Sequence, residues 1–158
     1  MELNEFLSKI KGRVLIAGIG NSLRADDAVG SYIVKKLSNE KIDAILVDCE
    51  DQPERFIEKI VHHKPDTVIF IDALHMNHEP GSVVFLEKKD LYHTGISTHQ
   101  TNLKMCIDYI KSRIKTEILI IGIQPENTDF GNRMSEKILD VAETLKNILI
   151  KALLLSRF

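Results

Sequence analysis

Short apolar runs alternate along this chain with longer stretches in which apolar residues recur at helical spacing. The runs are rich in β-branched residues and are long enough for buried strands, whereas the longer stretches have the period of amphipathic helices. The predicted strands are 13–19 (RVLIAGI), 43–49 (DAILVDC), 67–73 (TVIFIDA), 82–88 (SVVFLEK) and 117–123 (EILIIGI). The predicted helices are 26–38, 53–63, 98–113 and 135–155. Such alternation is typical of an α/β fold.

The strands differ in how they are connected. Most are apolar throughout, which indicates a sheet covered by helices on both faces. The strand at 82–88 follows the one at 67–73 after only the segment LHMNHEPG, which is too short for a crossover helix, so these two strands should run in opposite directions. We therefore predict a three-layer αβα sandwich around a mixed, mostly parallel five-stranded sheet with one antiparallel strand.

Length and composition favour one globular domain over residues 1–158, with 44% hydrophobic and 28% charged positions. A formal net charge of −2 and the lack of a Lys/Arg-rich block argue against nucleic acid as a partner. Neither end of the chain resembles a signal peptide or a membrane span, so we expect a cytoplasmic protein. Cys49 and Cys106 form no CxxC pair, which favours reduced thiols over a disulfide framework or a structural zinc site.

The first predicted strand leads into the segment GIGNSLRADDAVG, residues 18–30. Gly18 and Gly20 resemble the start of a dinucleotide-binding turn, but Leu23 stands where the third glycine would be. Asp26 and Asp27 follow, at the helix start where a pyrophosphate would bind free N–H groups. Two carboxylates there would repel a phosphate, so the segment favours a cation as ligand.

Further polar side chains follow the other strands at what should be the same edge of the sheet. Asp48 and Asp72 come at strand ends, and His99 lies at the start of the helix that leads into the last strand. Ligands of open α/β sheets bind outside the carboxyl ends of the strands. Carboxylates and an imidazole gathered there form a candidate site for a divalent cation. Other residues at this edge are Asn21, Cys49, Glu50, Asp51, His75, His78, Gln124 and Pro125.

Each candidate also has a purely structural interpretation. Asp26 is interpreted as the helix N-cap, accepting hydrogen bonds from the N–H groups of residues 28 or 29, which leaves Asp27 pointing about 100° further round the helix. A backbone N–H could satisfy the partly desolvated Asp72. His99 could be a surface residue beside a cap at Ser97 or Thr98, although a helix N-terminus would keep its ring neutral and able to bind metal.

The remaining histidines and the cysteines are weaker candidates. His62 and His63 suit the C-terminus of a helix, and the pair formed by His75 and His78 lies in a loop without a rigid helix to fix its spacing. Cys49 with His99 could form a thiol-protease pair, but Cys49 has no helix N-terminus to activate it. Cys106 shares its helix face with apolar residues and is predicted to lie in the core.

Four segments in register resemble the hydrogenase maturation endopeptidases, which trim the C-terminal extension from the large subunit of nickel–iron hydrogenases. They are GIGNSLRADDAVG, FIDALHMNHEPGSV, STHQTNL and GIQPENTDFG, and the resemblance runs from about residue 13 to residue 147. The last segment is most similar to the branch that processes formate-hydrogenlyase-type, or group 4, hydrogenases.

The resemblance implies that Asp27, Asp72 and His99 form the catalytic, metal-engaging site. It implies that the nickel is supplied by the substrate, the precursor of the large subunit, and that no organic cofactor is needed. Asp48 matches a family acid associated with substrate choice. The segment CEDQPE after it departs from the commoner glycine-rich loop, which bears on which precursor is recognised.

Two alternatives use the same residues. A nickel-binding chaperone or sensor of hydrogenase assembly would have the same ligands without peptidase activity. A nucleotide-binding module would use the glycine turn instead and would be stabilised by its nucleotide.

Overall fold

The computed structural model describes residues 1–92, 97–98 and 102–155. Its elements in chain order are α1 (Leu3–Ser8), β1 (Val14–Gly18), η1 (Ala25–Ala28), α2 (Val29–Leu37), β2 (Ile45–Asp48), η2 (Pro53–Arg55), α3 (Ile57–His63), β3 (Thr67–His75), β4 (Val83–Glu87), η3 (Lys88–Tyr92), β5 (Ser97–Thr98), α4 (Asn102–Arg113), β6 (Glu117–Ile123) and α5 (Glu136–Leu155), where η marks a 3-10 helix. Every strand and long helix predicted from the hydrophobic pattern is present.

The main sheet has the strand order β2-β1-β3-β6-β4. The neighbours β2, β1, β3 and β6 are parallel, and β4 runs antiparallel to β6. The prediction of a mixed sheet with one antiparallel strand is confirmed. The strand β4 is opposite in direction to β3, as its short connection requires, but it pairs with β6, which lies between them. The two-residue strand β5, which the pattern did not predict, pairs antiparallel with the end of β3.

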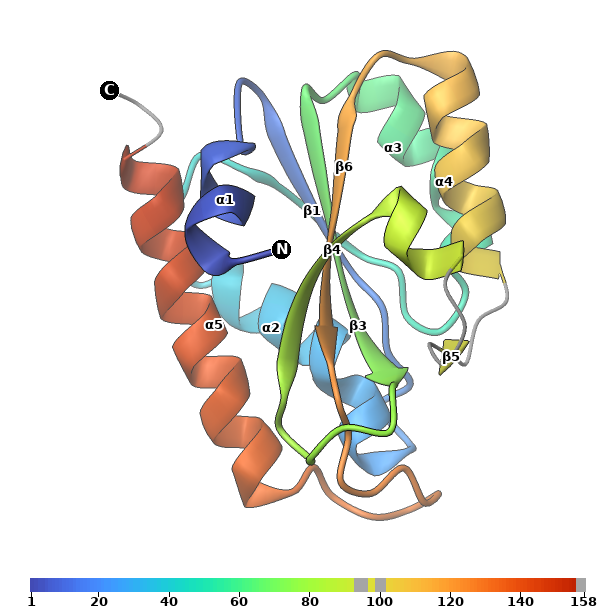
Figure 1. Cartoon of the computed structure of the whole chain (residues 1–158), viewed down its shortest axis with the longest axis vertical. Coiled ribbons are helices and arrows are strands. Elements are labelled where there is room, and N and C mark those ends of the chain that lie inside the picture. Colours follow the sequence, from blue (N-terminus) through green and yellow to red (C-terminus); the bar gives the residue numbers. More distant parts are fainter. Residues whose placement is uncertain (93–96, 99–101, 156–158) are drawn as a thin grey trace.

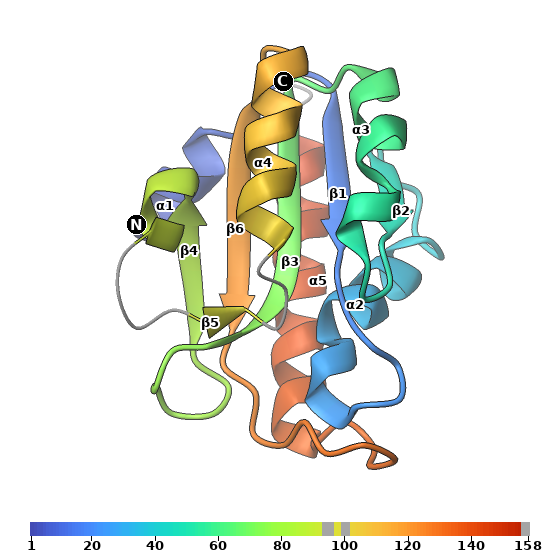
Figure 2. The same cartoon turned by 90° about the vertical axis from the view of Figure 1, so that its right-hand side faces the viewer.

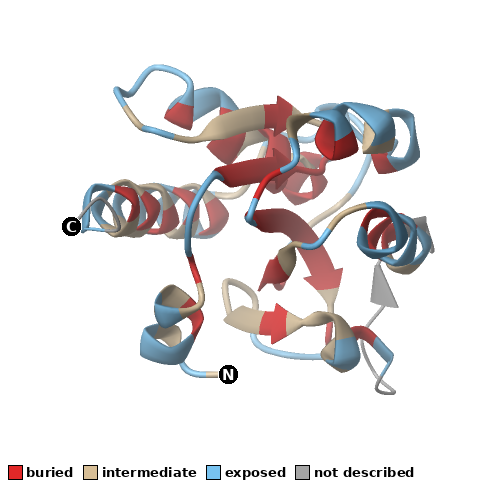
Figure 3. Ribbon diagram, turned by 90° about the horizontal axis from the view of Figure 1, so that it is seen from above, coloured by how far each residue is buried: buried red, intermediate tan, exposed pale blue. Residues whose placement is uncertain are grey.

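Helices cover both faces of the sheet, as Figure 1 and the turned view in Figure 2 show. Alternate residues of β3 point to opposite faces: Ile69 and Ile71 pack in the core with α1, α2 and α5, whereas Val68 and Phe70 pack in the core with α3 and α4. Figure 3 shows the resulting pattern, with buried strands at the centre and helices exposed on their outer sides.

Close backbone contact brings α2 against the strand ends. A Cβ on Gly30 would lie 2.2 Å from the carbonyl oxygens of both Ile19 and Ile71, and one on Gly18 would lie 2.2 Å from the carbonyl oxygen of Gly30. Side chains at these positions would force the helix away from the sheet. Gly18, from the turn that resembles a phosphate-binding one, and Gly30 therefore allow the start of α2 to pack closely on β1 and β3.

Three predicted helices become α-helical later than the pattern indicates. The stretch 26–38 starts as η1 and is α-helical only from Val29, and the stretch 53–63 starts as η2 and is α-helical only from Ile57. The stretch 98–113 becomes helical at Asn102. Among the described residues, no helix is long and apolar enough to cross a membrane.

Candidate active site

The carboxyl ends of the parallel strands meet at one edge of the sheet. Gly18, the last residue of β1, is paired with Asp48 of β2 on one side and with Ile71 of β3 on the other. Asp48 and Asp72 therefore lie at nearly the same level, on strands either side of β1. The turn that leaves β1 carries Asp27 in η1, which is seated on the same edge by the glycine contacts.

Asp72 is a buried carboxylate without adequate donors. It is 1% exposed, and Oδ2 accepts no hydrogen bond from any described residue. Burial raises the pKa of Asp72 well above its ordinary value, the nearby charge of Asp27 raises it further, and the backbone N–H of Ala73 opposes the shift. The protein thus keeps an acid in a place that penalises its negative charge.

Asp27 is the second buried acid at this edge. It is 4% exposed and lies in η1, whose first residue, Ala25, has a left-handed φ of 49°. The carbonyl oxygen of Asp27 accepts a hydrogen bond from the N–H of Asn21 (3.2 Å), which closes the turn around the pair of acids. A left-handed alanine is strained, so the turn holds η1 in a conformation that local preference alone would not select.

Asp26 corrects the sequence interpretation. Its fully buried carboxylate does not cap its own helix. It accepts hydrogen bonds from the N–H groups of Glu126 (3.0 Å), Asn127 (2.9 Å) and Ser135 (2.7 Å), and from the Ser135 hydroxyl (2.9 Å to Oδ2). The predicted cap assumed donors at residues 28 or 29, whereas the observed donors are about a hundred residues away along the chain. Asp26 fastens the loop between β6 and α5 to η1.

His99 lies outside the described residues, so its predicted place beside the two acids stays a prediction. The two residues that precede it are described: Thr98 pairs with Leu74 and Ser97 with His75, directly after Asp72 on β3. Within the described part of the chain, no group of three or more His, Cys, Asp or Glu side chains is arranged to hold a metal ion.

Asp48 lines a separate acidic pocket of about 330 Å³ beside the two buried acids. Its Oδ1 accepts hydrogen bonds from the Ser31 hydroxyl (2.7 Å) and the Glu50 N–H (3.0 Å), and Oδ2 lies 3.8 Å from Lys35 Nζ. The side chain remains 27% exposed. The other residues that line the pocket are Gly20, Asn21, Ser22, Leu23 and Asp51.

The cysteines are buried and poorly suited to be nucleophiles. Burial, with a smaller contribution from Asp48, raises the pKa of Cys49 to about 12, and burial raises the pKa of Cys106 to about 11. A nucleophilic thiol needs a lowered pKa and access to substrate, so the Cys49 thiol-protease alternative is disfavoured. Cys106 lies in the core as predicted.

Gln124 has a role that the sequence did not reveal. Its side-chain carbonyl accepts hydrogen bonds from the N–H groups of Met76 (2.7 Å) and His78 (3.4 Å). It holds the loop after β3 against the end of β6. The hydrogen bonds of the Gln124 side chain are therefore structural, and they stabilise this edge of the sheet. His75 ends β3 instead of lying in the loop, and His62 and His63 end α3 as predicted.

Asp27 and Asp72 are both buried, and their charges interact. Two neighbouring buried carboxylates repel one another, and a bound divalent ion would remove both the repulsion and the desolvation penalty. Carboxylate ligands leave coordination positions open for other donors.

Comparison with known proteins places the chain in one family. A family model described as hydrogenase maturation protease matches residues 31–152. A protein of Methanocaldococcus jannaschii assigned as a hydrogenase maturation protease is 32% identical over 89% of this chain and 95% of its own length. The hydrogenase 3 maturation protease of Escherichia coli is 30% identical over 80% of this chain and 82% of its own length. The crystal structure of the nickel–iron hydrogenase maturation protease HycI from Thermococcus kodakarensis superposes with a TM-score of 0.86, at 32% identity, covering 96% of this chain and 99% of that one.

Proposed function

Because the chain belongs to the hydrogenase maturation protease family and is therefore a peptidase, we propose that it removes the C-terminal extension from the nickel-loaded precursor of a nickel–iron hydrogenase large subunit. Family membership favours this endopeptidase role in hydrogenase maturation over a chaperone without peptidase activity and over a nucleotide-binding module. The likeness to the HycI branch supports a group 4 hydrogenase as the source of the precursor.

One observation carries the nickel-dependent part of the proposal. Asp72 Oδ2 is buried without a hydrogen-bond donor among the described residues, beside the charge of Asp27. An asparagine at this position would avoid the desolvation penalty, so an acid kept here supports a cationic ligand. In the proposal that ligand is the nickel ion of the substrate, contacted by Asp27, Asp72 and His99.

Substrate-bound nickel explains why the site can remain poorly satisfied in the free enzyme. The precursor brings the ion together with its own ligands, and the ion supplies positive charge near the peptide bond to be hydrolysed. Asp27 and Asp72 orient that ion. Precursor that lacks nickel would leave Asp72 Oδ2 without the ion that the proposal assigns to it and should dock poorly.

Asp48 is assigned to substrate choice in this proposal. Its carboxylate is partly exposed in the acidic pocket, and its hydrogen bonds to Ser31 and Glu50 fix its direction. It lies on β2, separated by β1 from Asp72, so it can contact parts of the precursor away from the ion.

The decisive experiment measures the mass of the precursor after incubation with the protein. Nickel-loaded precursor should lose its extension, while nickel-free precursor should stay intact under the same conditions. Equal cleavage of both forms would overturn the nickel requirement. Intact loaded precursor, bound in a stable complex, would support the chaperone alternative instead.

His99→Ala tests the undescribed member of the proposed site. We expect loss of processing with a nearly unchanged melting temperature, since a histidine at the edge of the sheet contributes little to the core. Normal processing would remove His99 from the site. A strongly lowered melting temperature would assign it a structural role.

A further inference from the structure

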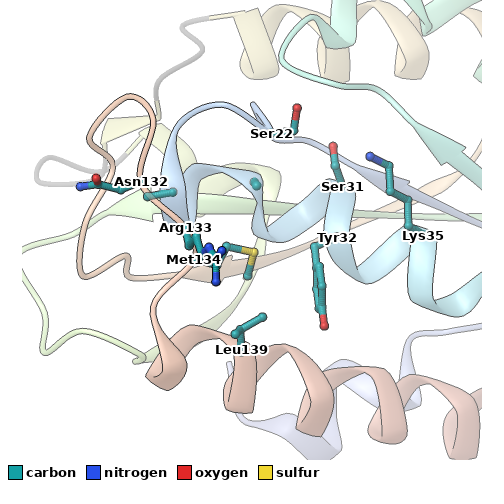
Figure 4. Close-up of a pocket in the computed structure, with 10 residues that line it drawn as sticks. Ser22, Ser31, Tyr32, Lys35, Asn132, Arg133, Met134 and Leu139 are labelled. Carbon is teal, nitrogen blue, oxygen red and sulfur yellow. The ribbon is translucent and has the colours of Figure 1, made fainter.

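A second pocket of about 430 Å³ lies between α2 and the start of α5 (Figure 4). Tyr32 on α2 and Leu139 on α5 project into the space between the two helices, and the segment before α5 closes one side. A volume in this range accommodates a peptide side chain together with its backbone. The lining residues are Ser22, Ala25, Ala28, Ser31, Tyr32, Lys35, Asn132, Arg133, Met134 and Leu139.

The chemistry of this pocket differs from that of the acidic pocket beside it. Apolar groups from Tyr32, Met134 and Leu139 are combined with two cations, Lys35 and Arg133, and no acid is among the described residues that line it. Arg133 is exposed and forms no ion pair within the described part of the chain, while Lys35 lies a loose 3.8 Å from Asp48. The complementary ligand is an apolar group next to a negative charge.

The pocket adjoins the proposed reaction site. Ala25 and Ala28, one turn apart on the same face of η1, line it, and Asp27 lies between them in the sequence. The two pockets share Ser22, Ser31 and Lys35. A peptide held near Asp27 can therefore reach this pocket within a few residues.

Two exposed apolar side chains lie close in sequence to residues that line the pocket. Leu23 is 59% exposed and follows Ser22, and Phe130 is 74% exposed and lies two residues before Asn132. Their loops are joined by a hydrogen bond from the N–H of Gly131 to the carbonyl of Leu23 (2.8 Å). Exposed apolar residues beside a pocket are typical of a protein-binding surface.

We propose, resting on the proposed function, that this pocket binds a segment of the precursor in which an apolar side chain lies next to a carboxylate. The apolar side chain enters between Tyr32, Met134 and Leu139, and the carboxylate pairs with Arg133. The pocket thus selects precursors by sequence near the cleaved bond, separately from the recognition of nickel by Asp27 and Asp72.

Two variants test the pocket in the processing reaction. Met134→Gln removes an apolar contact at similar size, and Arg133→Glu reverses an exposed charge. Arg133→Glu should raise the KM for nickel-loaded precursor by about three- to fivefold, the range for a solvent-exposed ion pair, with kcat and melting temperature nearly unchanged. Met134→Gln should also raise KM with kcat unchanged, and its melting temperature should fall because Met134 packs against the core. The matched controls on α5 are Leu154→Gln and Lys151→Glu, which lie outside the pocket and should leave KM as it is.

A direct binding measurement does not depend on cleavage. In a two-dimensional NMR titration, N-acetyl-leucine should shift the amide signals of Ala28, Tyr32 and Leu139, more strongly than N-acetyl-leucine amide, which lacks the carboxylate. Arg133→Glu should abolish the difference between the two probes.

The outcomes separate the two proposals. If both variants cleave loaded precursor with the KM of the wild type, the inference is wrong and the proposed function stands. The same follows if the probes shift amide signals only outside the pocket. Failure of the wild type to cleave loaded precursor would overturn the proposed function, while the titration would still decide the ligand chemistry of the pocket.

Discussion

Asp26 and Asp72 are both buried carboxylates at the same edge of the sheet, yet their surroundings are opposite. Asp26 accepts hydrogen bonds from the backbone N–H groups of Glu126, Asn127 and Ser135 and from the Ser135 hydroxyl. Asp72 leaves one oxygen without a described donor and lies near the charge of Asp27. Burial alone therefore does not distinguish structure from function. The two acids differ in their supply of donors, and the proposal assigns the ion to Asp72, whose Oδ2 has no donor among the described residues.

The largest expected effect belongs to Asp72→Asn. The substitution keeps the shape but removes the charge that a nickel ion needs, so cleavage of loaded precursor should fall by at least about 100-fold, beyond the usual effect of losing an outer-shell partner. The fold should be as stable as wild type or more so, because a desolvated charge has been removed. Cleavage assays and thermal unfolding check both parts. An active Asp72→Asn variant would show that the charge of Asp72 is not needed for cleavage, and that its lack of donors does not mark a functional site.

The pH dependence of unfolding sharpens the same prediction. The raised pKa of Asp72 means that the native state binds its proton more tightly than the unfolded chain, whose Asp pKa is about 3.9. The stability that Asp72 contributes is therefore fully present below about pH 4 and is lost as pH rises through the native pKa. Asp72→Asn should gain stability relative to wild type as pH rises over that range. A constant difference between the two proteins across pH would contradict the shift.

Asp26→Ala should instead lower stability. It leaves several N–H groups of the loop between β6 and α5 without their charged acceptor, at an expected loss of about 3 kcal/mol in the free energy of unfolding. For a chain of this size the melting temperature should fall by about 6–12 °C. Asp26→Ser should also destabilise, since a hydroxyl is too short to reach both sides of that loop. Asp140→Ala, an exposed acid on α5, is the control. A stable Asp26→Ser variant would restore the local-cap interpretation.

The hydrophobic pattern predicted the sheet and its helices because both depend on side chains close together in sequence. Continuous apolar strands such as Thr67–His75 could only be buried on both faces, and the short loop after β3 required β4 to reverse direction. The length of the loop could not predict that β4 pairs with β6 rather than with β3. That choice depends on which edge of the sheet is free once β6 has been added.

The candidate site was predictable only in part for a similar reason. Adjacent strand ends brought Asp27, Asp48 and Asp72 to one edge, as the parallel order implies. The role of Asp26 was missed because its partners are about a hundred residues away along the chain. A single sequence gives no signal for such a contact. Ser135 precedes α5 and is of a residue type that often caps helices, but this does not indicate that it binds Asp26.

Asp48→Asn should have a smaller effect than either buried acid. Asparagine keeps an oxygen that can accept from Ser31 and Glu50 but removes the charge, and the 3.8 Å pair with Lys35 contributes little. We expect KM for the precursor to change by about fivefold or less while kcat and melting temperature hold. Steady-state kinetics on loaded precursor measure this. A fall in kcat at constant KM would place Asp48 in the reaction itself rather than in substrate choice.

The smallest expected effect belongs to Cys49, a third buried ionisable group near these acids. Its thiol is fully buried, and with a pKa of about 12 only about one molecule in 10⁵ carries a thiolate at pH 7. A neutral thiol needs no ligand, so burial here stabilises the core without creating a site. Cys49→Ala should cost about 1 kcal/mol of stability and leave kcat/KM within about twofold of wild type, as should the core control Cys106→Ala. Iodoacetamide should likewise leave native enzyme active. A folded Cys49→Ala protein that no longer cleaves loaded precursor would show that the thiol takes part in the reaction. The difference in hydrogen-bond donors between Asp26 and Asp72 would then not be enough to identify the active site.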